Sequence, residues 1–515
     1  MTMLPPKDSL LENSQKDILG YFSPSYLLTF IRDKVNLDIF PKEILANIAV
    51  SSTITHERMH WNQFFGTTWG NICLLIKQCQ IDNFPDWNQF QDLKGILHEL
   101  KDITILDNYQ IHPNIRYKSR ESGIFLQQWR DNALTYELFT HDIPITKKIL
   151  SASESVACAL SDYYTTISDY FDIEEQIIIA EIDNLCNFKQ LIFPKISHNA
   201  TPLTVSDLLE GQARASEIIF SLNTLNLLDE IGMITHQEYL NYIYPFICET
   251  PYWRAFQDYL FISKKEVAKP FEFLKRLTEF CIIIDISLSV PWPPYVSPKI
   301  MGQLPWKLFY PVYRFFIICN VVKEIEEEIH DVFNFSSHLE YYEIICNCLN
   351  WPTPRQLAEN YLEISSDKYY NFAAQWENED FNGDNITIHD YYYYIFRNFC
   401  ELRIKSPTYI PNLGLTQIGS FSNIDLEYIC GVGSNKYWID SPLQLREKSN
   451  KILTKLKTSQ FNWISLNLLH NVIMNDYVLQ FKPISFRDFF FDVPDYALHK
   501  LNSLILDEYG ISILK

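Results

Sequence analysis

The chain has 515 residues, 47% of them hydrophobic, which is ample for a large buried core. Its formal net charge is -20 and it has no long basic run, so the sequence argues against nucleic acid or an anionic membrane as the main partner. The 11 cysteines are odd in number and lie mostly in apolar surroundings, which indicates reduced thiols rather than a disulfide framework.

We expect no targeting or membrane-spanning segment. Residues 1–16 carry prolines and acidic residues where a signal peptide needs an apolar core. The most apolar run, 280–290, is too short to cross a bilayer and contains Asp285. The sequence therefore predicts a cytoplasmic protein without a membrane partner.

The expected fold class is mainly α, a large multi-helix protein, because glycines are few (14) and turns are therefore scarce. Apolar spacing predicts a first helix from Pro41, which suits a first-turn position, to about Phe65. Gly66 and Gly70 can interrupt it before the pattern resumes over 71–80. The same spacing predicts further helices over 126–140, 150–170, 174–190, 205–228, 235–247, 270–285, 310–332, 338–348, 355–376, 388–403, 442–457 and 461–481.

Two segments depart from this helical pattern. Prolines are concentrated over 291–305 and forbid a continuous helix there. We divide the chain at this point into a helical domain (1–290), a proline-rich linker (291–305) and a helical, tyrosine-rich domain (306–515). The second segment, 409–440, has turn residues and β-formers and predicts a small β-hairpin.

The first predicted helix contains His56-Glu57-Arg58-Met59-His60, which fits the pattern H-E-x-x-H. Residues four apart lie on one helix face, so His56 and His60 can hold one metal ion together. Glu57 lies beside them and can take a proton from a metal-bound water, while Gln63 can hydrogen-bond that water or a substrate. Burying these polar groups without a partner is costly, and a metal ion is one such partner. The alternative is a pair of surface or hydrogen-bonded core histidines.

This motif resembles that of the zincin superfamily of metallopeptidases, over the motif helix only. The resemblance implies that His56 and His60 bind zinc and that Glu57 is the general base of a peptidase. The metzincin branch needs Gly at 63 and His at 66, where this chain has Gln63 and Gly66. The gluzincin branch takes its third zinc ligand from a glutamate on a later helix, often in an E-x-x-A-D setting.

The best match to that setting begins at Glu210 and ends at Arg214, which replaces the aspartate that orients a ligand histidine. The gap from the motif is also long for that branch. Apart from the resemblance, Ser206 or Asp207 can cap this helix, and small residues beside Glu210 allow another helix to approach. We expect Glu210 to be the third ligand, although a solvated first-turn carboxylate is an alternative. Competing third ligands are Glu217, Glu154 and Asp82.

The sequence thus predicts a zinc-dependent hydrolase, a peptidase with one Zn²⁺ per chain and a protein or peptide substrate. A second hypothesis is a helical di-iron or other metal-dependent oxidoreductase, because Glu57-x-x-His60 is also the E-x-x-H element of ferritin-like proteins. The chain's second E-x-x-H begins at Glu327 and ends at His330, where a solvated helix end is the alternative. The third hypothesis is a non-enzymatic interaction protein with a fortuitous motif. The sequence gives no oligomeric state.

Overall fold

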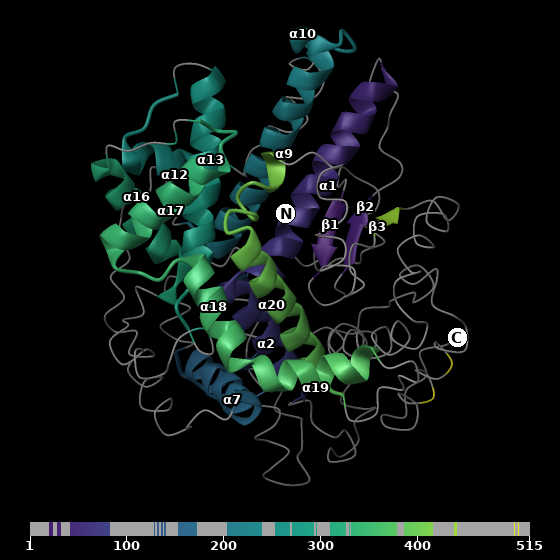
Figure 1. Cartoon of the computed structure of the whole chain (residues 1–515), viewed down its shortest axis with the longest axis vertical. Helices are drawn as coiled ribbons and strands as arrows, with labels where there is room; N and C mark the ends of the chain where they lie inside the picture. Colours follow the sequence, from purple (N-terminus) through teal and green to yellow (C-terminus); the bar gives the residue numbers. More distant parts are fainter. Residues whose placement is uncertain are drawn as a thin grey trace, which may run out of the picture.

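The protein is mainly α-helical, as predicted (Figure 1). The computed structural model describes residues 20–23, 28–31, 42–82, 153–171, 203–238, 253–267, 270–292, 309–325, 331–377, 386–415 and 437–439, with a few isolated positions between them. Within these ranges the helices that bear on the site are α1 (Glu43–Gly66), α2 (Thr68–Asp82), α9 (Val205–Glu230), α13 (Pro270–Leu288) and α20 (Ile388–Lys405). The others are α7 (Ser153–Phe171), α10 (His236–Glu238), α12 (Arg254–Ser263), α16 (Pro311–Glu324), α17 (Phe335–Leu349), α18 (Pro354–Ile364), α19 (Ser366–Glu377) and the 3₁₀ turn η7 (Leu413–Leu415).

Most predicted helices that fall within the described ranges are present, with small changes at their ends. The helix predicted over 355–376 is two helices, α18 and α19, separated at Ser365. The helix predicted over 310–332 ends at Glu324, because the next residue is extended. Helix α12 was not predicted. Its N-cap residue, Trp253, makes no side-chain capping hydrogen bond, so the sequence carries no capping signal at its start. The helices predicted over 174–190, 442–457 and 461–481 lie outside the described residues.

Three short strands form the small sheet beside α1 in Figure 1. Strands β1 (Gly20–Ser23) and β2 (Leu28–Ile31) pair antiparallel, and β3 (Tyr437–Ile439) pairs parallel with β2. A strand is therefore present within 409–440, where a hairpin was predicted, but it pairs with β2. The start of that segment, 409–415, forms turns and η7, and 416–436 lies outside the described residues.

Helix α1 ends at the predicted place, and its end is fixed by two side chains. Thr67 is extended and separates α1 from α2, while its hydroxyl donates to the carbonyl oxygen of Gln63 at 2.6 Å. The same hydroxyl accepts from the amide of Gly70 at 3.1 Å, which caps the start of α2. Arg403 on α20, 337 positions further along the chain, donates to the carbonyl oxygen of Gly66 at 3.0 Å.

Gly70 is required by this sharp break. A Cβ there would collide with backbone atoms of Gln63 and Phe64, and a helix backbone cannot move aside as a flexible side chain can. We expect Gly70→Ala to lower the free energy of unfolding by about 1–3 kcal/mol in urea titrations, as overpacking of a core does. Gly211→Ala is the matched control, since its Cβ would meet the ring of Phe280 at 3.2 Å and that ring can shift. Equal losses in the two variants would contradict this account of the break.

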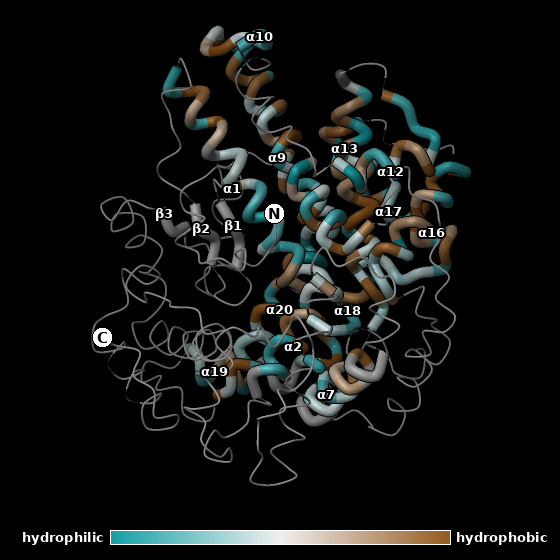
Figure 2. The backbone as a smooth tube through the Cα atoms, turned by 180° about the vertical axis from the view of Figure 1, so that it is seen from behind, coloured by the Kyte–Doolittle hydropathy of each residue, from teal (hydrophilic) through white to brown (hydrophobic). Residues whose placement is uncertain are grey.

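Helices from both sides of the proline-rich segment contribute to one hydrophobic core. Trp292, within that segment, is itself buried and lies against Phe309 with ring centroids 4.2 Å apart. The boundary at 291–305 stays a prediction. Inside this core, α1 and α9 lie side by side (Figure 1), and α13 packs on another side of α9. Part of α1 is hydrophilic although it lies within the molecule (Figure 2), and this polar stretch is where the site forms.

Candidate metal centre

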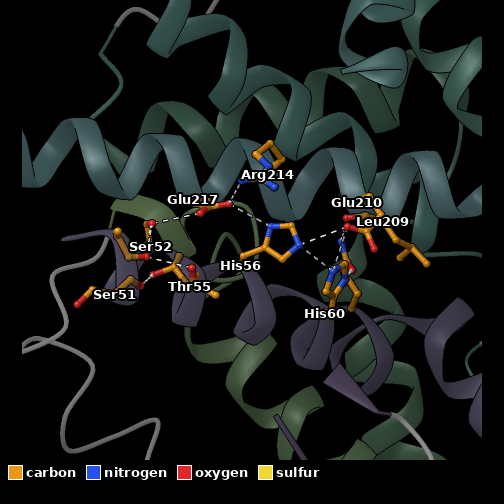
Figure 3. Close-up of polar contacts among 12 residues, drawn as sticks. Ser51, Ser52, Thr55, His56, His60, Leu209, Glu210, Arg214 and Glu217 are labelled. Carbon is orange, nitrogen blue, oxygen red and sulfur yellow. Dashed lines mark hydrogen bonds and ion pairs between the residues drawn. The ribbon is translucent and has the colours of Figure 1, made fainter. Parts of the chain in front are cut away.

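Two antiparallel helices supply the polar groups of the candidate site. Helix α1 contributes His56 and His60 from one face, and α9 contributes Glu210 and Glu217, two turns apart (Figure 3). The register is antiparallel because His60 meets Glu210, whereas His56 reaches both glutamates. Helix α9 begins with a capping box in which Thr204 is the N-cap and Asp207 its reciprocal partner. The expected cap at Ser206 or Asp207 was therefore placed too late.

His56, His60 and Glu210 bring three ligand atoms together. The Nε2 atoms of the histidines lie 3.2 Å apart, and Glu210 Oε2 lies 3.3 Å from His56 Nε2 and 3.5 Å from His60 Nε2. A tetrahedral zinc site with ligand bonds near 2.05 Å has ligand atoms about 3.4 Å apart. The three atoms thus form one face of a tetrahedron of the right size. All three residues are buried, which is costly for such polar groups unless they share a partner.

A chain of amides fixes which nitrogen of His60 carries the proton. Gln212 Nε2 donates to the carbonyl oxygen of Cys281, so its Oε1 is free to accept from Gln63 Nε2 at 2.9 Å. Gln63 Nε2 also donates to the carbonyl oxygen of Leu209, so the Gln63 oxygen must face His60 Nδ1, 3.0 Å away. Because that oxygen only accepts, Nδ1 carries the proton and the lone pair of Nε2 points to the other ligands.

His56 has the same orientation for a different reason. Its Nδ1 lies 3.2 Å from Glu217 Oε2, a carboxylate oxygen that favours a proton on Nδ1. In the neutral tautomers, the two Nε2 lone pairs and the Glu210 carboxylate therefore face one another, an arrangement that either a proton on one ring or a metal cation stabilises. Burial disfavours a charged His56, but the carboxylates of Glu210 and Glu217 outweigh burial and raise its pKa. Burial likewise works against ionised Glu210, but the two histidines hold its pKa well below the usual range.

Glu57 is a buried carboxyl in the same electrostatic environment. Its Oε2 has no hydrogen-bond partner among the described residues. Burial, followed by the negative charges of Glu210 and Glu217, raises the pKa of Glu57 to about 8, although His60 and Arg214 oppose the shift. A divalent cation in the triad would add positive charge and lower that pKa towards the range of a base at neutral pH.

The structure brings together His56, His60 and Glu210, the three ligands that the sequence predicted. Gln63 lies behind His60, with both ends of its amide bonded to protein groups; a contact with water or substrate stays a prediction. Of the competing third ligands, Glu217 lies on the Nδ1 side of His56, outside the triad. The side chains of Glu154 and Asp82 lie outside the described residues.

Sequence reasoning did not identify Gln212. The available signal was a single glutamine among small and apolar residues in α9, where burial requires hydrogen-bond partners. In the second E-x-x-H element, Ile329 is a described residue, while Glu327 and His330 lie outside the described part of the chain.

No family model, curated protein or solved structure matches this chain. Among the helices that the structure describes, none is both long and apolar enough to cross a membrane.

Proposed function

We propose that the protein is a zinc-dependent hydrolase whose metal ligands are His56, His60 and Glu210 and whose general base is Glu57. One observation carries the proposal: three lone-pair atoms converge at the spacing of a tetrahedral metal site, and the helix that supplies two of them also carries the buried carboxyl of Glu57. A bound zinc ion lowers the pKa of a coordinated water and polarises a carbonyl group.

Within this proposal, the side chains hold the site and move protons. The Gln63–Gln212 chain keeps the His60 lone pair directed into the site. Glu57 accepts the proton of the attacking water and returns it to the leaving amine, as a general base and then a general acid. The amide bond of a peptide is the substrate class that the zincin resemblance implies. The eight cysteines of the described residues are free, in keeping with a reducing compartment such as the cytoplasm.

Glu57→Gln tests this assignment directly. The amide cannot accept a proton, so we expect kcat on an amide-linked fluorogenic peptide library to fall by about 10²–10⁴-fold. Zinc content should stay unchanged, because Glu57 lies outside the ligand triad. The matched control is Glu43→Gln, an exposed glutamate at the start of the same helix, which should keep full activity. Wild-type rates in Glu57→Gln would rule out Glu57 as the base.

A second candidate, a mononuclear iron oxidoreductase, is favoured by the donor set itself. Two histidines and one carboxylate are also the ligands of non-haem iron oxygenases. Loading the protein anaerobically with Fe²⁺ and with Zn²⁺, and comparing the two affinities and activities, separates the candidates. Oxygen consumption by the iron form, without peptide hydrolysis by the zinc form, would favour the oxidoreductase.

A further inference from the structure

The geometry points to Glu217 as a positioning residue that holds the ligand histidine His56 and raises the metal affinity of the site. This inference rests on the proposed metal centre. It assigns to Glu217 a role different from that of a competing third ligand.

Both oxygens of Glu217 are used, so its orientation is fixed. Oε2 lies 3.2 Å from His56 Nδ1, on the side of the ring opposite the converging Nε2 atom. Oε1 accepts from the hydroxyl of Ser52 on α1 at 3.1 Å. Glu217 therefore contacts α1 at two positions, Ser52 and His56, which lie one helical turn apart (Figure 3). A ring held in this way has its Nε2 atom directed into the triad before any metal arrives.

The charge of Glu217 matters as much as its position. A carboxylate beside Nδ1 makes Nε2 of the same ring a better electron donor, and carboxylate partners are typical of metal-ligating histidines. The corresponding partner of His60 is the neutral amide of Gln63. The two ligand histidines thus differ in the group that faces Nδ1: a carboxylate for His56 and a neutral amide for His60.

Arg214 makes this buried carboxylate possible. It lies on the same face of α9, between Glu210 and Glu217, and its Nη1 donates to Glu217 Oε2 at 2.6 Å. A buried carboxylate without a countercharge is strongly disfavoured, so the guanidinium helps to keep Glu217 ionised beside His56. The pairing also explains an arginine at position 214, where the zincin resemblance expects an aspartate: the histidine-orienting carboxylate comes from Glu217 in the following turn.

The test uses the whole 515-residue chain, zinc, and cobalt as a coloured substitute for zinc. Glu217→Gln keeps the size of the side chain and removes its charge. We expect zinc affinity, measured by competition with a chelator, to fall by about 10–100-fold. We also expect the visible spectrum of the cobalt form to change in position and intensity, because a reoriented His56 alters the ligand field. A substitution that affected only packing would lower thermal stability without changing that spectrum.

Glu230→Gln is the matched control, since Glu230 is exposed at the far end of the same helix. It should leave affinity and spectrum at the wild-type values. If Glu217→Gln does not fold, Ser52→Ala removes the bond to Oε1 and should lower zinc affinity by a smaller factor, about 2–5-fold.

Wild-type affinity and an unchanged cobalt spectrum in the folded Glu217→Gln variant, or in Ser52→Ala if that variant replaces it, would overturn the role of Glu217 and leave the triad intact. Failure of the wild-type chain to bind either metal would instead overturn the metal centre itself, and the role of Glu217 with it.

Discussion

Replacing His56 and His60 together with alanine should abolish metal binding. Wild-type protein reconstituted with zinc should retain about one ion per chain after dialysis, and the double variant none, because Glu210 alone is a single carboxylate ligand. Elemental mass spectrometry gives this ratio directly. His236→Ala, in which an exposed histidine paired with Asp229 is lost, is the control and should bind zinc as the wild type does.

The same pair of proteins should differ in their response to metal on heating. If zinc binds the folded wild-type site as proposed, it should add about 4 kcal/mol of stability at a free concentration one thousand times the Kd. A chelator should reverse this gain. The midpoint temperature of unfolding of the double variant should be the same with and without zinc. A zinc-dependent shift that persists in the double variant would mean that the ion binds elsewhere.

Asp285→Asn should cause the largest loss of stability among the variants considered. Asp285 is fully buried on α13 and forms two ion-pair contacts with Arg403, at 2.6 and 2.8 Å. The hydroxyl of Tyr342 on α17 also donates to it. The substitution leaves the buried guanidinium of Arg403 without its countercharge, which typically costs about 3–5 kcal/mol. Urea unfolding followed by circular dichroism measures this difference.

An exposed ion pair provides the comparison for Asp285. Arg355 and Glu359 are paired at 2.9 Å on the surface of α18, with about half of each side chain exposed. Glu359→Gln should cost less than about 0.5 kcal/mol, because water and salt screen exposed charges. Asp285→Asn would contradict the buried-pair argument if its loss were as small as that of Glu359→Gln.

The sequence was sufficient for the parts of the site that depend on spacing along one helix. His56 and His60 share a face because they are four residues apart, and Gly66 and Gly70 marked the break after α1. Glu210 was identifiable because small neighbours and a capped start suggested a closely packed helix. These are local properties, and helix geometry translates them directly into structure.

The rest of the site depends on the antiparallel register between α1 and α9, which no local pattern encodes. That register decides that Glu217 faces Nδ1 of His56 and does not join the triad. It also brings Gln212 to the amide of Gln63. The pairing of Asp285 with Arg403 is of the same kind, since 118 positions separate them. Helix α12 was missed for a local reason. It ends at Lys264 in a left-handed conformation, and the residue that usually marks such a helix end in a sequence is glycine.

The bond from Arg403 to the last turn of α1 has a consequence for how the protein is made. Its partners are 337 positions apart, so the ribosome must synthesise most of the chain before the end of the motif helix can be secured. Helix α9, which carries Glu210, emerges well before that point and can pack on α1. We therefore expect the last turn of α1, where Arg403 binds, to stay exposed in the nascent chain for much of translation, a period in which chaperones protect slow-folding chains with many distant contacts.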